Sequence, residues 1–166
     1  MLRDAFGEAF RVLKPGRFLS VVFGNSSGRI WGLVQRALRD AGFGEAPVHV
    51  ATLDKGQRSV KGLSSGTESV ATVDLIITVQ KPAMIAAHEA AIPGRADPAG
   101  MIRKAIAGMK EDALPTPSHL YAAILHQAIE AHLLLDGLHL SDVLIALRDA
   151  GYGVDRKTGR LEARKA

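Results

Sequence analysis

The polar segment at 54–69 holds the residues best suited to bind a polyanion. It carries the cations of Lys55, Arg58 and Lys61, the amide of Gln57, and flexible glycines. Such cations neutralise phosphates, and a guanidinium or an amide can read the edge of a base. We therefore predict that these four residues contact nucleic acid. Exposed loops are also basic for solubility alone, and that explanation stays open.

A second candidate is the Gly-Asn-Ser-Ser-Gly loop at 24–28. It follows an apolar run and precedes a helical pattern, which is where doubly wound folds collect ligands and free backbone amides attract anions. Asn25 is accordingly predicted at the mouth of a pocket. A loop that only turns the chain has the same composition, so both interpretations stand.

Histidines and carboxylates do not gather into a metal site in this sequence. His119, His126, His132 and His139 recur at steps of seven, six and seven residues, so they do not share one helical face. His88 opens a pattern like that of a zinc-protease helix, but Ile92 occupies the place of the second histidine. The sequence therefore predicts no metal ligand.

Composition narrows the possible classes of protein. The chain has 166 residues, 47% hydrophobic and 23% charged, which excludes wholesale disorder. Its net charge of +4 agrees with a polyanionic partner. Without cysteine there is no disulfide, thiolate metal site or cysteine nucleophile. No apolar run approaches the roughly 20 residues of a membrane span and no signal peptide is recognisable, so we expect a cytoplasmic protein with no membrane partner.

The first half of the sequence predicts alternating helices and strands. Helical spacing over 1–13 ends at a Lys-Pro-Gly turn, and the apolar run at 17–23 is typical of a strand covered on both faces in a parallel sheet. A helix to about residue 41 follows. Residues 47–53 and 70–80 predict two further strands, with 54–69 as the long loop of a hairpin.

From residue 83 onward the composition predicts a second, all-helical module. Asp97-Pro98 and Thr116-Pro117 are good helix starts, and the second helix is expected to reach Leu135. Ser141 is the expected cap of a last helix through residue 150. A basic tail follows, made of Arg156, Lys157, Arg160, Arg164 and Lys165.

One short repeat has a structural explanation. The sequence ALRDAGF at 37–43 recurs as ALRDAGY at 146–152. We predict that each copy ends a helix, with its glycine in the left-handed conformation and the aromatic residue packed on the leucine near the helix end.

The order of these pieces resembles S-adenosylmethionine-dependent methyltransferases. The segment 8–19, EAFRVLKPGRFL, is similar to the helix-turn-strand passage just before their fifth strand, although Arg17 stands where the family often has a second glycine. The helix, strand, loop and apolar strand that follow resemble the end of that fold, whose last strand runs antiparallel. This much is shared by methyltransferases in general.

More specific segments resemble large bacterial and archaeal adenine-specific DNA methylases. They are VFGN at 22–25 followed by Trp31, and LDKGQRSVKG at 53–62 leading to TVDLIIT at 72–78. The likeness covers residues 1–82, and GYGVDRKTGR at 151–160 resembles the tail appended to such proteins. The resemblance implies the carboxy-terminal half of a methyltransferase domain at 1–82 and a helical module at 83–166.

The implied fold is α/β: the carboxy-terminal portion of a Rossmann-like class I methyltransferase sheet, with a parallel strand and an antiparallel hairpin. The implied reaction moves a methyl group from S-adenosylmethionine to a base amine in DNA, namely adenine N6. The family's cofactor loop, aromatic-x-Gly-x-Gly, and its Asp/Asn-Pro-Pro-Tyr/Phe motif lie upstream of this passage, and neither occurs here. We therefore assign no catalytic or cofactor-binding residue, and expect no binding of S-adenosylmethionine to this chain alone.

The resemblance also has a consequence for folding. Three strands form only the edge of a seven-stranded sheet, so the first strand is expected to expose an unpaired flank and part of an apolar face. We expect the missing amino-terminal half, or a partner chain, to complete the sheet. A non-enzymatic nucleic-acid-binding or assembly subunit, and a methyltransferase acting on RNA or a small molecule, are the alternatives, because one fold hosts many substrates.

Overall fold

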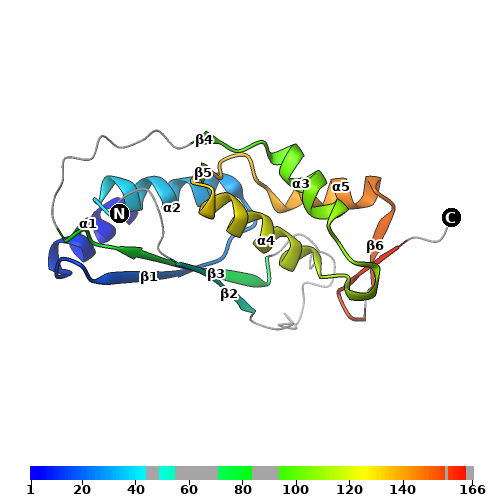
Figure 1. Ribbon diagram of the computed structural model, residues 1–166, viewed down its shortest axis with the longest axis horizontal. Coiled ribbons are helices and arrows are strands. Elements are labelled where there is room, and N and C mark those ends of the chain that lie inside the picture. The colour runs from blue at the N-terminus through cyan, green and yellow to red at the C-terminus, as the bar shows by residue number, and fades with distance from the viewer. Residues whose placement is uncertain (44–48, 55–70, 84–93, 156, 164–166) are drawn as a thin grey trace.

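The computed structural model describes residues 1–43, 49–54, 71–83, 94–155 and 157–163, and it is mixed α/β (Figure 1). Five α-helices lie in the described residues: α1 (Leu2–Val12), α2 (Gly28–Asp40), α3 (Pro98–Ala107), α4 (Pro117–Glu130) and α5 (Leu140–Asp149). A short 3-10 helix, η2, spans Glu111–Ala113. The strands are β1 (Phe18–Phe23), β2 (His49–Asp54), β3 (Val73–Gln80), β4 (Gly94–Arg95), β5 (Leu133–Leu134), β6 (Tyr152–Val154) and β7 (Leu161–Ala163).

The main sheet has three strands in the order β1-β3-β2. β3 runs antiparallel to both neighbours, with Ile77 opposite Val21 on one side and Val50 on the other. The predicted antiparallel hairpin is therefore confirmed as β2–β3. β1 and β2 run in the same direction, and β3 lies between them.

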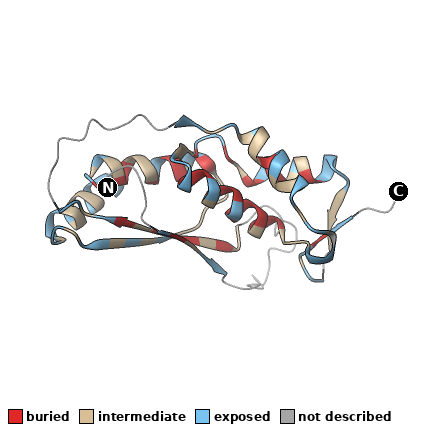
Figure 2. Ribbon diagram, in the orientation of Figure 1, coloured by how far each residue is buried: buried red, intermediate tan, exposed pale blue. Residues whose placement is uncertain are grey.

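The two faces of this sheet differ in burial. On β3, Val73, Leu75, Ile77 and Val79 are buried while the alternate residues are not, so one face supplies the core. The helices lie on that face (Figures 1 and 2). On the opposite face the side chains of Phe18 and Val22 are 55% and 54% exposed.

The expectation that the first strand is covered on both faces was wrong for this part of the chain. In β1 exposed and partly buried residues alternate, which is the pattern of a strand with one packed face. The reason is that all the described helices lie on the same side of the sheet.

The turn between α1 and β1 is held by a lysine from the end of β3. Lys81 Nζ donates to the carbonyl oxygens of Phe10 at 2.5 Å and Leu13 at 2.7 Å, and lies 4.5 Å from the centre of the Phe10 ring. Gly16 has a φ of 74°, which the Lys-Pro-Gly turn requires. The predicted helix-turn-strand is thereby confirmed and tied to β3.

The predicted helix end at 37–43 is confirmed. Gly42 has a φ of 98°, its N–H donates to Arg39 O at 2.8 Å, and the Phe43 N–H donates to Leu38 O at 3.3 Å. These are the two hydrogen bonds of a Schellman motif. The buried Phe43 ring meets Phe10 of α1 edge-to-face, with 5.1 Å between ring centres. The cap therefore also joins α1 to α2.

The second half of the chain contains strands as well as helices, so the expectation of an all-helical module was wrong. β4 pairs with β5 in parallel, and β6 pairs with β7 in an antiparallel hairpin. The expected extension of the second helix to Leu135 was also wrong. α4 ends at Glu130, and His132 has a φ of 56°, which reverses the chain and starts β5.

The start of the last helix also differs from expectation. The cap of α5 is His139, and Ser141 lies inside the first turn. The Ser141 hydroxyl lies 3.5 Å from Asp142 Oδ1 and does not cap the helix. The chain enters α5 early because the Leu140 N–H donates to Ser26 O at 2.9 Å, which fixes the helix start against the loop after β1.

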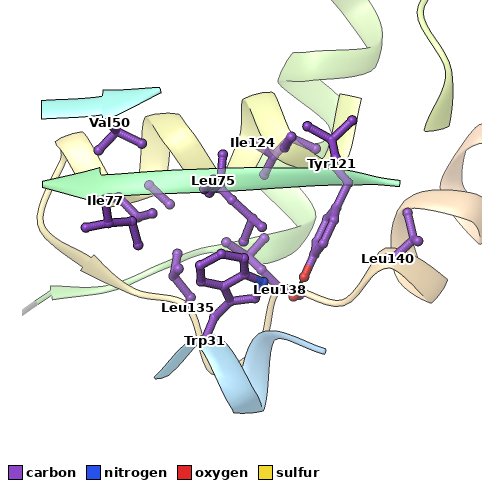
Figure 3. Packing of buried hydrophobic residues seen from close by; sticks show 14 of the residues in the cluster. Trp31, Val50, Leu75, Ile77, Tyr121, Ile124, Leu135, Leu138 and Leu140 are labelled. Carbon is purple, nitrogen blue, oxygen red and sulfur yellow. Dashed lines mark hydrogen bonds between the residues drawn. The ribbon is translucent and has the colours of Figure 1, made fainter. Parts of the chain in front are cut away.

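A single hydrophobic cluster joins the two halves of the chain (Figure 3). It includes Trp31 of α2, Leu75 of β3, Tyr121 of α4, and Leu135 and Leu138 of the turn between β5 and α5. The Tyr121 hydroxyl donates to Leu138 O at 2.9 Å, so the polar end of this buried ring is satisfied. Residues on both sides of the predicted boundary at 82–83 therefore share one core.

Candidate functional site

Asn25 lies in the loop between β1 and α2, as the sequence predicts. Its Oδ1 accepts a hydrogen bond from the Ser27 N–H at 2.8 Å, and its backbone oxygen accepts one from Trp31 Nε1 at 2.9 Å. The first of these is an Asx turn. Both carbonyl groups of Asn25 therefore shape the loop itself.

The same loop has a motif spacing that the sequence reasoning missed. Residues 24–28 read Gly-x-Ser-x-Gly between a strand and a helix, which is the spacing of the nucleophile elbow of α/β-hydrolases. That elbow holds its serine in a strained backbone conformation. Among the described residues His132 is the only non-glycine residue with a positive φ, so Ser26 does not have a left-handed backbone. The backbone oxygen of Ser26 accepts a hydrogen bond from the Leu140 N–H at the start of α5. The loop is thus a relaxed turn between β1 and α2.

Gly24, at the start of this loop, allows a close approach of β3. A Cβ added there would overlap the carboxylate of Asp74, and Asp74 lies on the face of β3 away from the core. This face and the loop therefore meet at the end of β1.

Lys55, Gln57, Arg58 and Lys61 lie outside the described residues, so their contact with nucleic acid stays a prediction. The structure does describe the two ends of their segment. Asp54 Oδ2 lies 3.2 Å from His119 Nε2, and the Thr72 N–H donates to Ser118 Oγ at 3.2 Å. Both ends of the predicted loop are thus held by the first turn of α4.

The first turn of α4 is itself fixed by Thr116. The Thr116 hydroxyl oxygen accepts the His119 N–H at 3.2 Å, which is an N-cap, and lies 2.7 Å from His119 Nδ1. With the threonine O–H donating to Nδ1, Nε2 carries the proton and donates to Asp54. The Thr116 hydroxyl, the His119 imidazole and the Asp54 carboxylate form a chain of hydrogen bonds, and the hydroxyl also caps α4. These hydrogen bonds therefore act as a clamp on the end of β2.

The predicted basic tail is a structured hairpin over the residues that the structure describes. β6 and β7 pair with Tyr152 opposite Ala163 and Val154 opposite Leu161. Leu161 is 4% exposed, and its N–H donates to Pro115 O at 2.9 Å. Lys157 and Arg160 are exposed, while Leu161 anchors the segment to the residue before the α4 cap.

Three chain segments therefore meet at residues 115–119, which we call the α4 junction. Pro115 holds β7, Ser118 holds the chain just before β3, and His119 holds the end of β2. The sequence signalled the helix start at Thr116-Pro117 but not these partners, because each lies more than 40 residues away along the chain. The end of β2 and the strand β7 each adjoin a stretch of the sequence that is rich in lysine and arginine.

Two shifted pKa values belong to residues described above or at the hairpin tip. Burial raises the pKa of Tyr121, with Asp142 nearby adding to the effect. The Lys157 N–H and the Thr158 hydroxyl lower the pKa of Asp155 at the hairpin tip.

Among the described residues no group of three or more His, Asp or Glu is placed to hold a metal ion. None of the helices described has the length and apolar character to cross a membrane.

Comparisons with known proteins gave no relatives for this chain. No protein-family model matches the sequence, and neither the curated proteins nor the solved structures include a match.

Proposed function

We propose that this chain is the carboxy-terminal part of an S-adenosylmethionine-dependent methyltransferase that methylates a base amine in DNA, with adenine N6 as the acceptor. In this proposal the cofactor loop and the Pro-Pro motif come from a preceding segment or a partner chain. That part of the protein and the present chain together form a Rossmann-like sheet. The present chain contributes the sheet edge and basic surface that faces DNA.

The arrangement of the main sheet carries this proposal. An α-helix leads by a tight turn into β1, α2 connects β1 to β2, and β3 runs antiparallel between the two. The resemblance in sequence implies an antiparallel last strand after a helix-turn-strand passage. Direction, order and local sequence therefore agree over the same residues.

The exposed flank of β1 supports a need for further strands. In the described residues β1 pairs only with β3, so its other edge carries backbone groups without strand partners. Phe18 and Val22 on β1, and Leu2 and Val12 on α1, are each more than 40% exposed. An open strand edge beside exposed apolar side chains is a surface that another chain segment can pair with and cover.

The described residues do not fit the cofactor by themselves. The loop after β1 is closed by its own hydrogen bonds and by the bond from Leu140 N to Ser26 O, and Gly24 lies against Asp74. We therefore derive no methyl-transfer step from these residues. Bound to the complete protein, the cofactor would supply the methyl group that the base nitrogen attacks.

The rival hypotheses differ in what they predict for the coding region. Reading the DNA upstream of the Met1 codon should reveal an in-frame Asp/Asn-Pro-Pro-Tyr/Phe motif, or the same motif in a neighbouring gene. A region without this motif would favour the non-enzymatic assembly subunit.

A calorimetric titration of the isolated chain with S-adenosylmethionine tests the division of labour. We expect no binding heat. A micromolar affinity would overturn the assignment of the cofactor site to the missing segment.

A further inference from the structure

The stretch from residue 152 to 166, which contains the β6–β7 hairpin, carries most of the excess positive charge of the chain. From residue 152 onward five cations stand against two carboxylates, which accounts for three of the four net positive charges. Two of these cations, Lys157 and Arg160, lie in the described part of the tip, and both are exposed. Excess charge gathered in one short stretch of the chain attracts a polyanion more than the same charge spread over the surface.

Hydrogen bonds join Asp155 to the other described residues of the tip. Asp155 Oδ1 accepts the Lys157 N–H at 2.7 Å, and Oδ2 accepts the Thr158 hydroxyl at 2.9 Å. The Arg160 N–H donates to Thr158 Oγ1 at 3.3 Å, and the Asp155 N–H to Arg160 O at 2.8 Å. Gly159, with a φ of 68°, makes the turn. The backbones that carry the two cations are thus fixed before any ligand binds.

The Asp155 carboxylate accepts hydrogen bonds from these donors and, in the part of the chain that the structure describes, forms no ion pair with Lys157 or Arg160. A phosphate that binds the two cations therefore does not have to displace this carboxylate. None of the ion pairs among the described residues involves Lys157 or Arg160. Contact of Lys157 or Arg160 with a phosphate therefore breaks no ion pair among the described residues, and hydrogen bonds already hold the backbone at both positions.

The base of the hairpin lies at the α4 junction. Leu161 N is bonded to Pro115 O, and His119, four residues further on, is bonded to Asp54 at the end of β2. The hairpin and the end of β2 are therefore both attached to the start of α4, and the hairpin and the α1–β1 turn lie at opposite ends of the molecule (Figure 1).

We propose that Lys157 and Arg160 at the tip of the β6–β7 hairpin form a preorganised contact with the phosphate backbone of DNA. The inference deepens the proposed function, because it names a contact with the substrate on this chain. The contact is made to the backbone and does not depend on base sequence. Its strength falls with salt concentration, since each neutralised phosphate releases counterions.

The test measures binding of the full chain to a fluorescein-labelled DNA duplex by polarisation at several salt concentrations. We expect Lys157→Ala/Arg160→Ala to weaken binding about tenfold at low salt and to reduce the salt slope by about 1.8, the value for two phosphates. The matched control is Lys14→Ala/Arg17→Ala, which removes one lysine and one arginine from an exposed turn at the other end of the molecule. An equal loss in the control would overturn the proposal, since net charge alone would then explain the effect. Unchanged affinity of the hairpin variant, or no binding by the wild type, would overturn it as well.

Asp155→Ala separates geometry from charge. This change removes a negative charge beside the two cations, so charge alone predicts tighter binding. Loss of the hydrogen bonds at the tip predicts weaker binding, which is our expectation. Tighter binding would contradict the claim of preorganisation. Vesicles of phosphatidylserine serve as a second probe, and loss of vesicle binding by the hairpin variant with unchanged DNA affinity would assign the tip to a membrane and overturn the proposal.

The two proposals fail in different ways. If the complete protein methylates DNA but the hairpin variant binds DNA like the wild type, the hairpin contact is wrong and the proposed function stands. If the hairpin variant loses DNA binding but the complete protein transfers no methyl group to DNA, the proposed function is wrong and the hairpin contact stands.

Discussion

Gly28 of α2 lies directly against the backbone of Leu138, in the turn that leads to α5. A Cβ added to Gly28 would overlap the carbonyl oxygens of Leu135 and Leu138 and lie 2.6 Å from Leu138 N. Only glycine allows this approach, because the atoms in the way are backbone and cannot rotate aside. The first turn of α2 and the second half of the chain are packed together at this point.

Gly28→Ala is therefore expected to lower the free energy of unfolding by about 2–3 kcal/mol, the cost of overpacking a close contact. Urea denaturation followed by circular dichroism measures the change. Gly7→Ala is the matched control, because Gly7 also lies inside a helix and a Cβ there meets nothing within 4 Å. We expect this control to gain about 0.5–1 kcal/mol. Equal stability of the two variants would show that α2 and the turn are not packed as described.

Tyr121→Phe removes the hydroxyl that donates to Leu138 O inside the core. We expect a loss of about 1–2 kcal/mol near neutral pH, because a buried carbonyl is left without its donor. Tyr152→Phe, on the half-buried strand β6, is the matched control and should change stability less. A change no larger than that of the control would mean that the hydroxyl of Tyr121 is not bonded in the folded protein.

The wild-type protein should also lose stability at alkaline pH through Tyr121. Burial raises the pKa of this residue in the folded state above its value of about 10 in the unfolded chain. A raised pKa contributes stability that is present below pH ~10 and is lost as the pH rises beyond that value. Tyr121→Phe cannot ionise, so its stability curve should fall less steeply there. Identical curves for the two proteins above pH 10 would contradict the burial of Tyr121.

Ser118→Ala tests the clamp at the α4 junction. The Ser118 hydroxyl accepts the N–H of Thr72, just before β3. Because one net hydrogen bond stabilises by about 1 kcal/mol, its loss should speed hydrogen exchange at the Thr72 amide several-fold while the core strands keep their protection. Ser141→Ala, in the first turn of α5, should leave Thr72 unaffected. Unchanged exchange at Thr72 in the first variant would show that α4 does not hold this end of the segment.

The sequence predicted most elements of the first 80 residues, because their signals are local. Lys14-Pro15-Gly16 ends a helix through its own turn residues. The alternation of apolar and other residues along β3 indicates a strand with one buried face. The second half was harder to predict. α4 stops at Glu130 because the chain turns at His132, and Leu135 is drawn to α2 by hydrogen bonds with Gln35, whose amide donates to Leu133 O at 3.0 Å and accepts from Leu135 N at 3.1 Å.

In the candidate site, too, contacts between distant parts of the chain could not be predicted from the sequence. The place of Asn25 at the mouth of a pocket stays a prediction, and the structure adds that its carbonyl groups close the loop that carries them. The meeting of Asp54, His119 and Leu161 at the α4 junction depends on contacts between distant parts of the chain, which no local pattern signals. The basic residues near 160 were predicted correctly as a cluster of charge, but their hairpin depends on the packing of Leu161.

The most direct measurement of the central claim is methyl transfer by the complete protein, made with the upstream segment or with the partner chain. The assay supplies labelled S-adenosylmethionine and duplex DNA, and nucleoside analysis then identifies the modified base. The proposed function predicts label in DNA as N6-methyladenine, with none when this chain is left out. Label recovered only in RNA or in a small molecule, or full DNA methylation without this chain, would contradict it.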